Sequence, residues 1–409
     1  MDLSKPLARE SFPHTSEKGR IKATIANLAH LFKSYGITCQ YDEMLKKQTI
    51  ATANAEDDND LSGNAILAEI QSALALNDMP VSCLNLIPSL MKRNIVNPVL
   101  AFIQSEPWDG KDRLPTFYES LQVEAKDEGY RDLAVRTWLL QCVAAADSAK
   151  STPIKHATAK FELVLVLQGG QGALKTTWFR SLLPKDMSAY IVDGAHLDPA
   201  DKDTVKRCIS CWICELGELD ATFRRADVAR LKAFLSSERD NIRLPYDRAD
   251  SSFMRRTSFG ASVNPKTFLV DDTGARRFLP LAISKCRPIS HDIQQIWAQV
   301  WHLYINGSQW WSSPELERLL IDIHAEHAED SPVIEMISEA FNVSEPVKRD
   351  FLRFEHLTAI QIIRESGIDS PNKTQLQQAR AFLEAKGFKN VQSTSNKRGY
   401  WITKEIDGL

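Results

Sequence analysis

The sequence has no long apolar run and few cysteines. Its longest aliphatic stretch, residues 163–167, is far shorter than the ~20 residues that span a bilayer. The first 20 residues lack the apolar segment of a signal peptide. The seven cysteines are odd in number and scattered over 409 residues, which is typical of reduced thiols. We therefore expect no membrane span, no disulfide framework and a cytoplasmic location.

Charge of one sign is not in excess either. Lys and Arg number 50 against 53 Asp and Glu, a net charge of −3. Such a chain does not coat nucleic acid indiscriminately, so any contact with DNA must come from local patches. The remaining composition, with 43% hydrophobic residues, is that of an ordinary folded protein long enough for two to four domains.

The hydrophobic pattern changes several times along the chain. Apolar residues first recur at helical spacing, then short β-rich runs alternate with helices, which indicates an α/β domain around a buried sheet. The last section reads as two helices followed by two short strands, the outline of a winged helix. The predicted divisions are a disordered tail (1–20), a mostly helical domain (21–125), the α/β domain (126–315), a helical linker (316–347) and a winged-helix-like domain (348–409).

A glycine-rich segment follows the apolar strand LVLVL and precedes a helix. In such a loop, backbone N–H groups and a helix N-terminus surround phosphates, a lysine reaches the terminal phosphoryl oxygens and a hydroxyl ligates Mg²⁺. Lys175 and Thr176 have those two roles in this interpretation, and ATP with Mg²⁺ is the expected cofactor pair. The predicted nucleotide-binding residues are Gly169, Gly170, Gln171, Gly172, Ala173, Leu174, Lys175, Thr176 and Thr177.

One position departs from the usual GxxxxGK[ST] pattern. Leu174 stands where a glycine permits tight curvature and close approach of phosphate. Two interpretations therefore stay open for the segment: a working phosphate site, or a glycine-rich turn that carries an ordinary surface lysine.

Polar residues that end later strands supply the other groups that an NTPase needs. Glu215 ends the apolar run CWIC and is our candidate for the Mg²⁺ site, while Glu218 could polarise the attacking water. Asn264 ends the strand FGASV and suits a sensor of the γ-phosphate. Arg276 and Arg277 follow a turn and could stabilise transition-state charge in a neighbouring subunit. Each of these could equally be a solvated group at a strand end.

The spacing of Cys208, Cys211 and Cys214 resembles a metal site at first sight. We place all three on one strand, where residues three apart point to opposite faces. We therefore predict buried thiols whose sulfur atoms do not converge.

Taken together, these motifs resemble the virulence-associated protein E family, P-loop ATPases of phages, prophages and genomic islands that are similar to superfamily 3 helicases. The likeness runs from about residue 20 to about residue 315. It is carried by WDGKDRL (108–114), GGQGALKTTW, ICELGELD, LKAFLSSERDNIRLPYDR (231–248), SVNPKTFLVDDTGARRFLPL and the tryptophan-rich IWAQVWHLYINGSQWW.

The resemblance implies an α/β P-loop NTPase core of the superfamily 3 or AAA+-like type. It implies hydrolysis of ATP at the subunit interfaces of a ring, with six protomers as the expected number, and movement along DNA during replication. Lys175 and Thr176 carry over as nucleotide and Mg²⁺ contacts, and Asn264 as the sensor. Glu215 and Glu218 carry over as the acidic pair and Arg276 or Arg277 as the arginine finger. A primase or another replication protein is a candidate partner.

Two segments are candidates for contact with DNA. The first combines Arg243, Tyr246 and Arg248, which could grip phosphates and stack a base, although nearby acids could instead pair with these arginines. The second is the basic C-terminal section, where a winged helix could equally dock a protein. Its predicted DNA contacts are Lys373, Arg380, Lys397 and Arg398.

The hypothesis from sequence is thus an ATP-driven DNA helicase or translocase. Its first alternative is a nucleotide-binding DNA-binding protein in which Leu174 abolishes hydrolysis. A second alternative is a single-subunit phosphotransferase for a small molecule, which would need an acceptor-binding domain that the sequence does not reveal.

Overall fold

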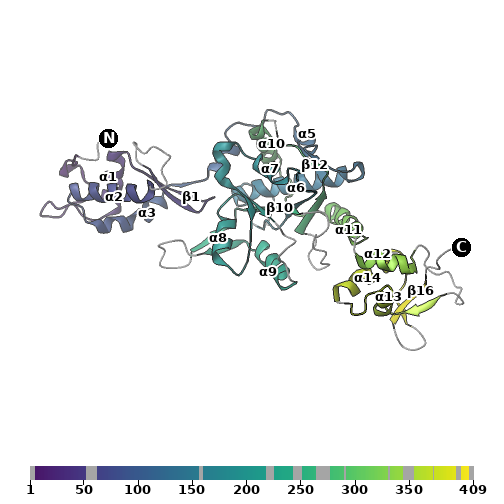
Figure 1. The fold of residues 1–409 in the computed structure, drawn as a ribbon. Helices are drawn as coiled ribbons and strands as arrows, with labels where there is room; N and C mark the ends of the chain where they lie inside the picture. The colour runs from purple at the N-terminus through teal and green to yellow at the C-terminus, as the bar shows by residue number, and fades with distance from the viewer. Residues whose placement is uncertain are drawn as a thin grey trace. The chain divides into compact units, whose positions relative to one another are not determined.

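The computed structural model describes eleven stretches of the chain, and all structural statements below concern these. They are residues 5–51, 62–155, 160–217, 225–242, 251–263, 277–289, 292–329, 332–343, 354–371, 373–392 and 398–404. Contacts divide the chain into two compact units (Figure 1). Unit 1 comprises residues 1–267 and 281–311, and unit 2 comprises residues 268–280 and 312–409.

The N-terminal part of unit 1 packs helices on a small sheet. Thr24 caps its first helix by accepting a hydrogen bond from the Asn27 backbone N–H, and Gly36 ends that helix in the left-handed conformation at φ 70°. The sheet has the order β2-β1-β3. The elements are α1 (Ile25–Tyr35), β1 (Thr38–Asp42), β2 (Lys47–Ala51), α2 (Ser62–Leu76), the 3₁₀ helix η2 (Val81–Leu86), α3 (Ile87–Met91) and β3 (Ile95–Val96).

Residues 5–20 do not form the predicted tail. The 3₁₀ helix η1 (Arg9–Ser11) leads to Phe12, which is buried in the same hydrophobic cluster as α1 and α2. The Leu7 N–H donates to the side chain of Asn77. Burial of Phe12, packing of Leu7 and this hydrogen bond therefore hold the segment against the helices, which its composition did not indicate.

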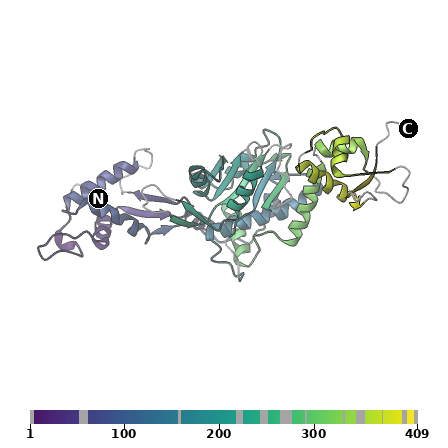
Figure 2. The ribbon, with the colours of Figure 1, turned by 90° about the horizontal axis from the view of Figure 1, so that it is seen from below.

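The centre of unit 1 is a five-stranded sheet of order β11-β5-β10-β7-β6. Four neighbouring strands, β5, β10, β7 and β6, run parallel, so the predicted α/β fold is confirmed. Figure 2 shows these strands side by side with helices packed against them. The strands are β5 (Val164–Gln168), β6 (Ile191–Ala195), β7 (Ile213–Gly217), β10 (Ser258–Val263) and β11 (Phe278–Ala282).

Helices cover both faces of this sheet. Phe259 of β10 contacts Phe234 of α9, whereas the next residue, Gly260, lies under Phe179 of α7. Successive strand residues point to opposite faces, so α7 and α9 lie on opposite sides. The helices of this region are α4 (Pro98–Ile103), α5 (Leu114–Tyr118), η3 (Ala125–Asp127), α6 (Glu128–Asp147), α7 (Lys175–Arg180), η4 (Lys185–Tyr190), α8 (Lys202–Ile209), α9 (Arg225–Leu235) and α10 (Ile293–Ile305).

Tryptophan N–H groups fasten the buried helices to the strands and loops of this sheet. Trp138 of α6 donates to the carbonyl of Phe259, and Trp212 donates to the carbonyl of Cys142. Trp297 of α10 donates to the carbonyl of Leu182. Each indole thus fills core volume and satisfies its own donor, which is the condition for burying tryptophan without cost.

Two small strand pairs complete unit 1. β4 (Leu121–Gln122) pairs with β12 (Lys285–Cys286), and β8 (Arg239–Ile242) forms a hairpin with β9 (Ser251–Met254). A fully buried ion pair between Arg255 and Asp240 ties the base of the hairpin. The loop that joins β8 to β9 lies outside the described residues.

The turn between β1 and β2 docks on the central domain. Tyr190 donates to the Asp42 carboxylate at 2.6 Å, Glu43 forms an ion pair with Arg256, and the buried Lys46 ammonium donates to the carbonyl of Ile209. Charged groups withdrawn from water therefore attach the N-terminal part of unit 1 to the part that holds the five-stranded sheet.

Unit 2 packs α12 (Pro332–Ala340), α13 (Ala359–Glu365) and α14 (Lys373–Ala385) around one core. Its sheet has the order β13-β16-β14, with β15 on β16. Residues 316–347 were predicted to form a helical linker, but Val333, Ile334 and Ile337 within this range belong to the core. The other elements are α11 (Pro314–Glu329), β13 (Phe341–Asn342), β14 (Glu355–Leu357), β15 (Val391–Gln392) and β16 (Arg398–Lys404). Within the described ranges, no helix has the length and apolar character needed to cross a membrane.

We predict that Lys46 makes stability depend on pH. Burial, the largest cause, lowers the pKa of its ammonium from 10.5 to about 8. Between these values the unfolded chain binds more protons than the folded protein, so the stability of the wild type rises with pH. Lys46→Met lacks this titration, and its stability relative to the wild type should fall by as much as about 3 kcal/mol from about pH 7 to about pH 10.

Urea unfolding of both proteins across this pH range measures the difference. Lys92→Met, at an exposed lysine, is the matched control and should differ from the wild type by a constant amount. A constant difference for Lys46→Met as well would contradict the prediction.

Candidate nucleotide-binding site

The glycine-rich segment forms a loop between β5 and α7. Gly169 N–H donates to the carbonyl of Val263 on β10, and Gly172 has a φ of 84°, which a glycine adopts without strain. The helix begins at Lys175, so its first free N–H groups border the loop. The predicted sequence of strand, loop and helix is therefore confirmed in its backbone.

Leu174 has the conformation for which a glycine is the usual choice. Its φ of 63° and ψ of 27° are left-handed, and its side chain is 40% exposed. The substitution thus keeps the curvature of the loop at a cost of about 1 kcal/mol of backbone strain and places an apolar side chain on the surface.

Lys175 lies over the loop. Its ammonium donates to the carbonyls of Gly169 at 2.5 Å and Gly170 at 3.1 Å. Burial raises the pKa of the nearby Cys286 thiol to about 12, against the opposing effect of the Lys175 charge. The Lys175 ammonium thus places a positive charge beside the backbone of the loop.

A buried carboxylate meets the first turn of α7. Glu215 of β7 is only 1% exposed, and its Oε1 accepts a hydrogen bond from the Thr176 hydroxyl at 3.4 Å. Its Oε2 accepts from the backbone N–H of Gly194 at 2.6 Å. The structure therefore brings together Thr176 and Glu215, which the sequence places 39 residues apart.

The sequence analysis missed Gly194. The pairing of β6 with β7 shifts between Val192 and Ala195, and Gly194 has a φ of 57° at this irregularity. The bulge turns the Gly194 N–H toward Glu215. An Asp-Gly pair inside a strand pattern was the signal available in the sequence.

A second missed glycine brings α7 close to the sheet. A Cβ on Gly260 would lie 2.4 Å from the ring of Phe179, so only glycine leaves room for this helix. Gly260 is paired with Glu215 across β10 and β7. The loop is also held from the other side, because the Cys286 N–H donates to the carbonyl of Ala173.

Several predicted site residues lie outside the described residues, namely Glu218, Asn264, Arg276, Arg243, Tyr246, Arg248 and Lys397. Of the others, Arg277 is half-buried and directly precedes β11, whereas Gln171 and Thr177 are exposed beside the loop. Arg380 and Arg398 are exposed in unit 2, and Lys373 begins α14.

The prediction for the three cysteines was wrong in two respects: they do not share a strand, and their sulfur atoms do converge, because the Cys208 and Cys211 thiols both hydrogen-bond to that of Cys214. Cys208 lies in α8, Cys211 in the turn that follows and Cys214 on β7, so they do not share a strand. All three are buried, and hydrogen bonds with Cys208 and then Cys211 raise the pKa of the Cys214 thiol. In the part of the chain that the structure describes, no group of three or more Cys, His, Asp or Glu residues is arranged to hold a metal ion.

We predict that two neighbouring glycines of the loop differ in their tolerance of alanine. A Cβ at Gly169 would lie 2.8 Å from the Ile283 carbonyl, whereas one at Gly170 would meet nothing within 4 Å. Gly169→Ala should therefore lower the free energy of unfolding by about 1–3 kcal/mol, and Gly170→Ala should change it by less than about 1 kcal/mol. Denaturant titration of both variants tests this, and equal effects would show that the loop packs differently.

Comparisons with known proteins found similar solved structures and one matching family model. Two structures of the NrS-1 C-terminal region without ligand are similar in fold, at 14% and 13% identity, each with a TM-score of 0.45 and covering 92% of this chain and 98% or 99% of theirs. No curated protein sequence matches the chain. The model of the virulence-associated protein E-like domain matches residues 103–329, which include the loop, Glu215 and α10. The chain therefore belongs to the virulence-associated protein E-like family.

Proposed function

We propose that this protein is an ATP-driven DNA translocase or helicase that acts in the replication of a phage, prophage or genomic island. The observation that carries the proposal is the meeting of the Thr176 hydroxyl with the buried Glu215 carboxylate beside the loop. A hydroxyl and a carboxylate at the start of a phosphate-binding helix are the groups that an NTPase needs for its metal. Family membership over residues 103–329 supports the same function.

The residues present fit Mg²⁺ with ATP. Both candidate metal contacts, Thr176 and Glu215, offer oxygen atoms, which Mg²⁺ prefers. Bound there, Mg²⁺ would neutralise charge on the phosphates. The loop N–H groups and the Lys175 ammonium would bind phosphate oxygens, while the Gly194 N–H keeps the Glu215 carboxylate in place.

Our proposal includes a ring, hexameric by analogy with superfamily 3 helicases, in which Arg276 or Arg277 reaches the nucleotide of a neighbouring subunit. Glu218 and Asn264 would activate and sense the reacting groups. The order of these residues in the chain and the family resemblance support these roles. A primase or another replication protein remains the proposed partner.

The proposed ATP-driven activity is tested by measuring ATP turnover of the purified protein. Turnover is measured with and without single-stranded DNA and over a series of protein concentrations. Turnover should rise cooperatively with concentration and increase with DNA. Lys175→Ala and Arg277→Ala should each reduce it by at least about 100-fold, because each removes charge stabilisation at the phosphates. Full activity of a monomer, or of Arg277→Ala, would contradict catalysis between subunits.

A second candidate function is nucleotide binding without hydrolysis. The exposed apolar side chain of Leu174 at the loop is the observation that favours it. Leu174→Gly keeps the left-handed backbone and removes that side chain. If the wild type binds ATP without turnover and Leu174→Gly hydrolyses it, the leucine is the block. Similar turnover by both proteins would reject this alternative.

We further propose that unit 2 is a winged-helix-like domain that binds DNA. Its helices α13 and α14 and its strands β15 and β16 occur in the order of that motif. Arg380 and Arg398 are exposed and could contact phosphates, as could Lys373 and Lys397 at positions where the sequence predicts contacts.

Duplex DNA binding measured over a range of salt concentrations tests this domain. Arg380→Ala and Arg398→Ala should each weaken binding and reduce the slope of log K against log salt by about 0.9, because each removes one phosphate contact. Arg318→Ala, at an exposed arginine of α11, is the control and should leave the slope unchanged. Unchanged slopes for all three variants would favour a protein-docking role.

A further inference from the structure

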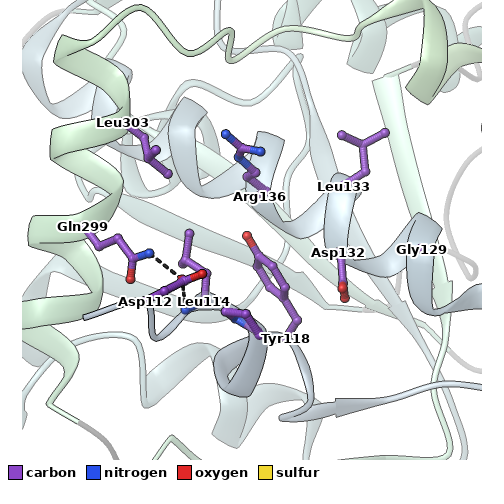
Figure 3. Close-up of a pocket in the computed structure, with 10 residues that line it drawn as sticks. Asp112, Leu114, Tyr118, Gly129, Asp132, Leu133, Arg136, Gln299 and Leu303 are labelled. Carbon is purple, nitrogen blue, oxygen red and sulfur yellow. Dashed lines mark hydrogen bonds between the residues drawn. The ribbon is translucent and has the colours of Figure 1, made fainter. Parts of the chain in front are cut away.

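A pocket of about 420 Å³ lies in unit 1, between the WDGKDRL segment and the helices α5, α6 and α10 (Figure 3). It is lined by residues of all four elements, among them Asp112, Tyr118, Arg136 and Gln299. None of the groups proposed to act on ATP lines it. The proposed ATP-driven activity assigns no role to the WDGKDRL motif, whereas the motif forms part of this pocket.

The segment that forms one wall is held rigidly. Arg113 makes a two-point ion pair with Asp109, and its backbone N–H donates to Gln299 of α10. Gln295 accepts from the Asp109 N–H, and the Trp108 indole packs against the ring of His302. A loop fastened at so many points presents a preformed surface, which lowers the entropy cost of binding.

The interior of the pocket is mostly apolar. Leu114, Leu133 and Leu303 come from the segment, α6 and α10. The ring of Tyr118 adds an aromatic wall (Figure 3). A ligand body of hydrocarbon would therefore be stabilised by leaving water here.

Among the described residues, nothing pairs with two polar groups on one side of the pocket. The Tyr118 hydroxyl is buried and makes no hydrogen bond, and Arg136, which is exposed to solvent, makes no ion pair there. Figure 3 shows the hydroxyl pointing toward the side of the pocket where Arg136 lies. Burial raises the pKa of Tyr118. The charge of Arg136 opposes this effect, whereas the charges of Asp132 and Asp112 add to it. An unmade hydrogen bond of a buried hydroxyl lowers stability, and a ligand that accepts this bond would recover the loss.

The two carboxylates of the pocket already accept hydrogen bonds from other residues. Asp132 accepts from the Arg131 guanidinium at 2.8 Å. Asp112 Oδ1 accepts from the Gln299 side chain at 2.6 Å and from the Leu114 N–H at 3.2 Å. The donors to Asp112 are neutral, so its negative charge persists beside the pocket. Arg136 is the one cation among the lining residues, and its exposed side chain is available to pair with an anion.

We infer that this pocket binds an amphipathic carboxylate, whose apolar body packs on Leu114, Leu133 and Leu303 and whose carboxylate accepts hydrogen bonds from Tyr118 and Arg136. A free organic acid and the C-terminal residue of a peptide share this chemistry. The inference does not depend on ATP hydrolysis, because the pocket and its test involve neither Lys175 nor Glu215.

Binding of N-acetyl-L-phenylalanine to the full chain, measured by ligand-observed NMR and calorimetry, tests the inference. Its carboxamide, which lacks only the charge, should bind at least about tenfold more weakly, because charge-assisted hydrogen bonds are lost. The tripeptide acetyl-Ala-Ala-Phe, as acid and as amide, separates the sources. Tighter binding of the peptide acid indicates a chain terminus, and tighter binding of the single residue indicates a free acid.

Variants of the pocket complete the experiment. Gly129 lines it in the first turn of α6, and a Cβ there meets nothing within 4 Å, so Gly129→Phe should fold and fill the space while Gly129→Ala leaves it open. Gly129→Phe and Arg136→Gln should each weaken binding at least about tenfold. The controls are Gly129→Ala and Arg93→Gln, the latter at an exposed arginine outside the pocket. Both should bind with the affinity of the wild type. Absent binding of the acid, equal binding of the amide, or wild-type affinity in Gly129→Phe would each overturn the inference.

Discussion

The buried carboxylate of Glu215 is the constraint on which the rest of the site depends. A charge withdrawn from water persists only if hydrogen bonds replace its hydration, and here the Thr176 hydroxyl and the Gly194 N–H do so. These donors come from α7 and from the bulge of β6. Two features are therefore needed to surround this carboxylate with its donors. One is the strand order, which places β7 between β10 and β6, and the other is the close approach of α7 over Gly260.

The same packing joins the phosphate loop to the pocket. Trp178 of α7 donates to the Ser120 hydroxyl, two residues after Tyr118 of the pocket wall. Ser120 also accepts, through its carbonyl, from the Arg287 N–H, next to β12, whose Cys286 holds Ala173. The residues that follow α5 are thus joined to the loop by two hydrogen-bonded routes, one through α7 and one through β12.

Sequence patterns predicted what depends on local order. The strand before the loop and the helix that follows the loop were predicted from the apolar run and the placement of the glycines. The Asp-Gly pair at Gly194 indicated an irregular strand but not its partner Glu215, and nothing in the local sequence indicated that Gly260 lies under Phe179, because both partners are distant in sequence. The cysteine prediction failed for a related reason: α8 ends at Ile209, inside a run that reads as one strand.

Leu174 shows that a motif specifies a backbone conformation rather than a residue type. Glycine is usual at this position because the backbone is left-handed there. This chain adopts the same conformation with leucine, at a strain of about 1 kcal/mol. Hydrogen bonds at both ends of the loop, from Gly169 to Val263 and from Cys286 to Ala173, maintain it. The surrounding structure thus determines the backbone at this position, so a departure in sequence need not be a departure in geometry.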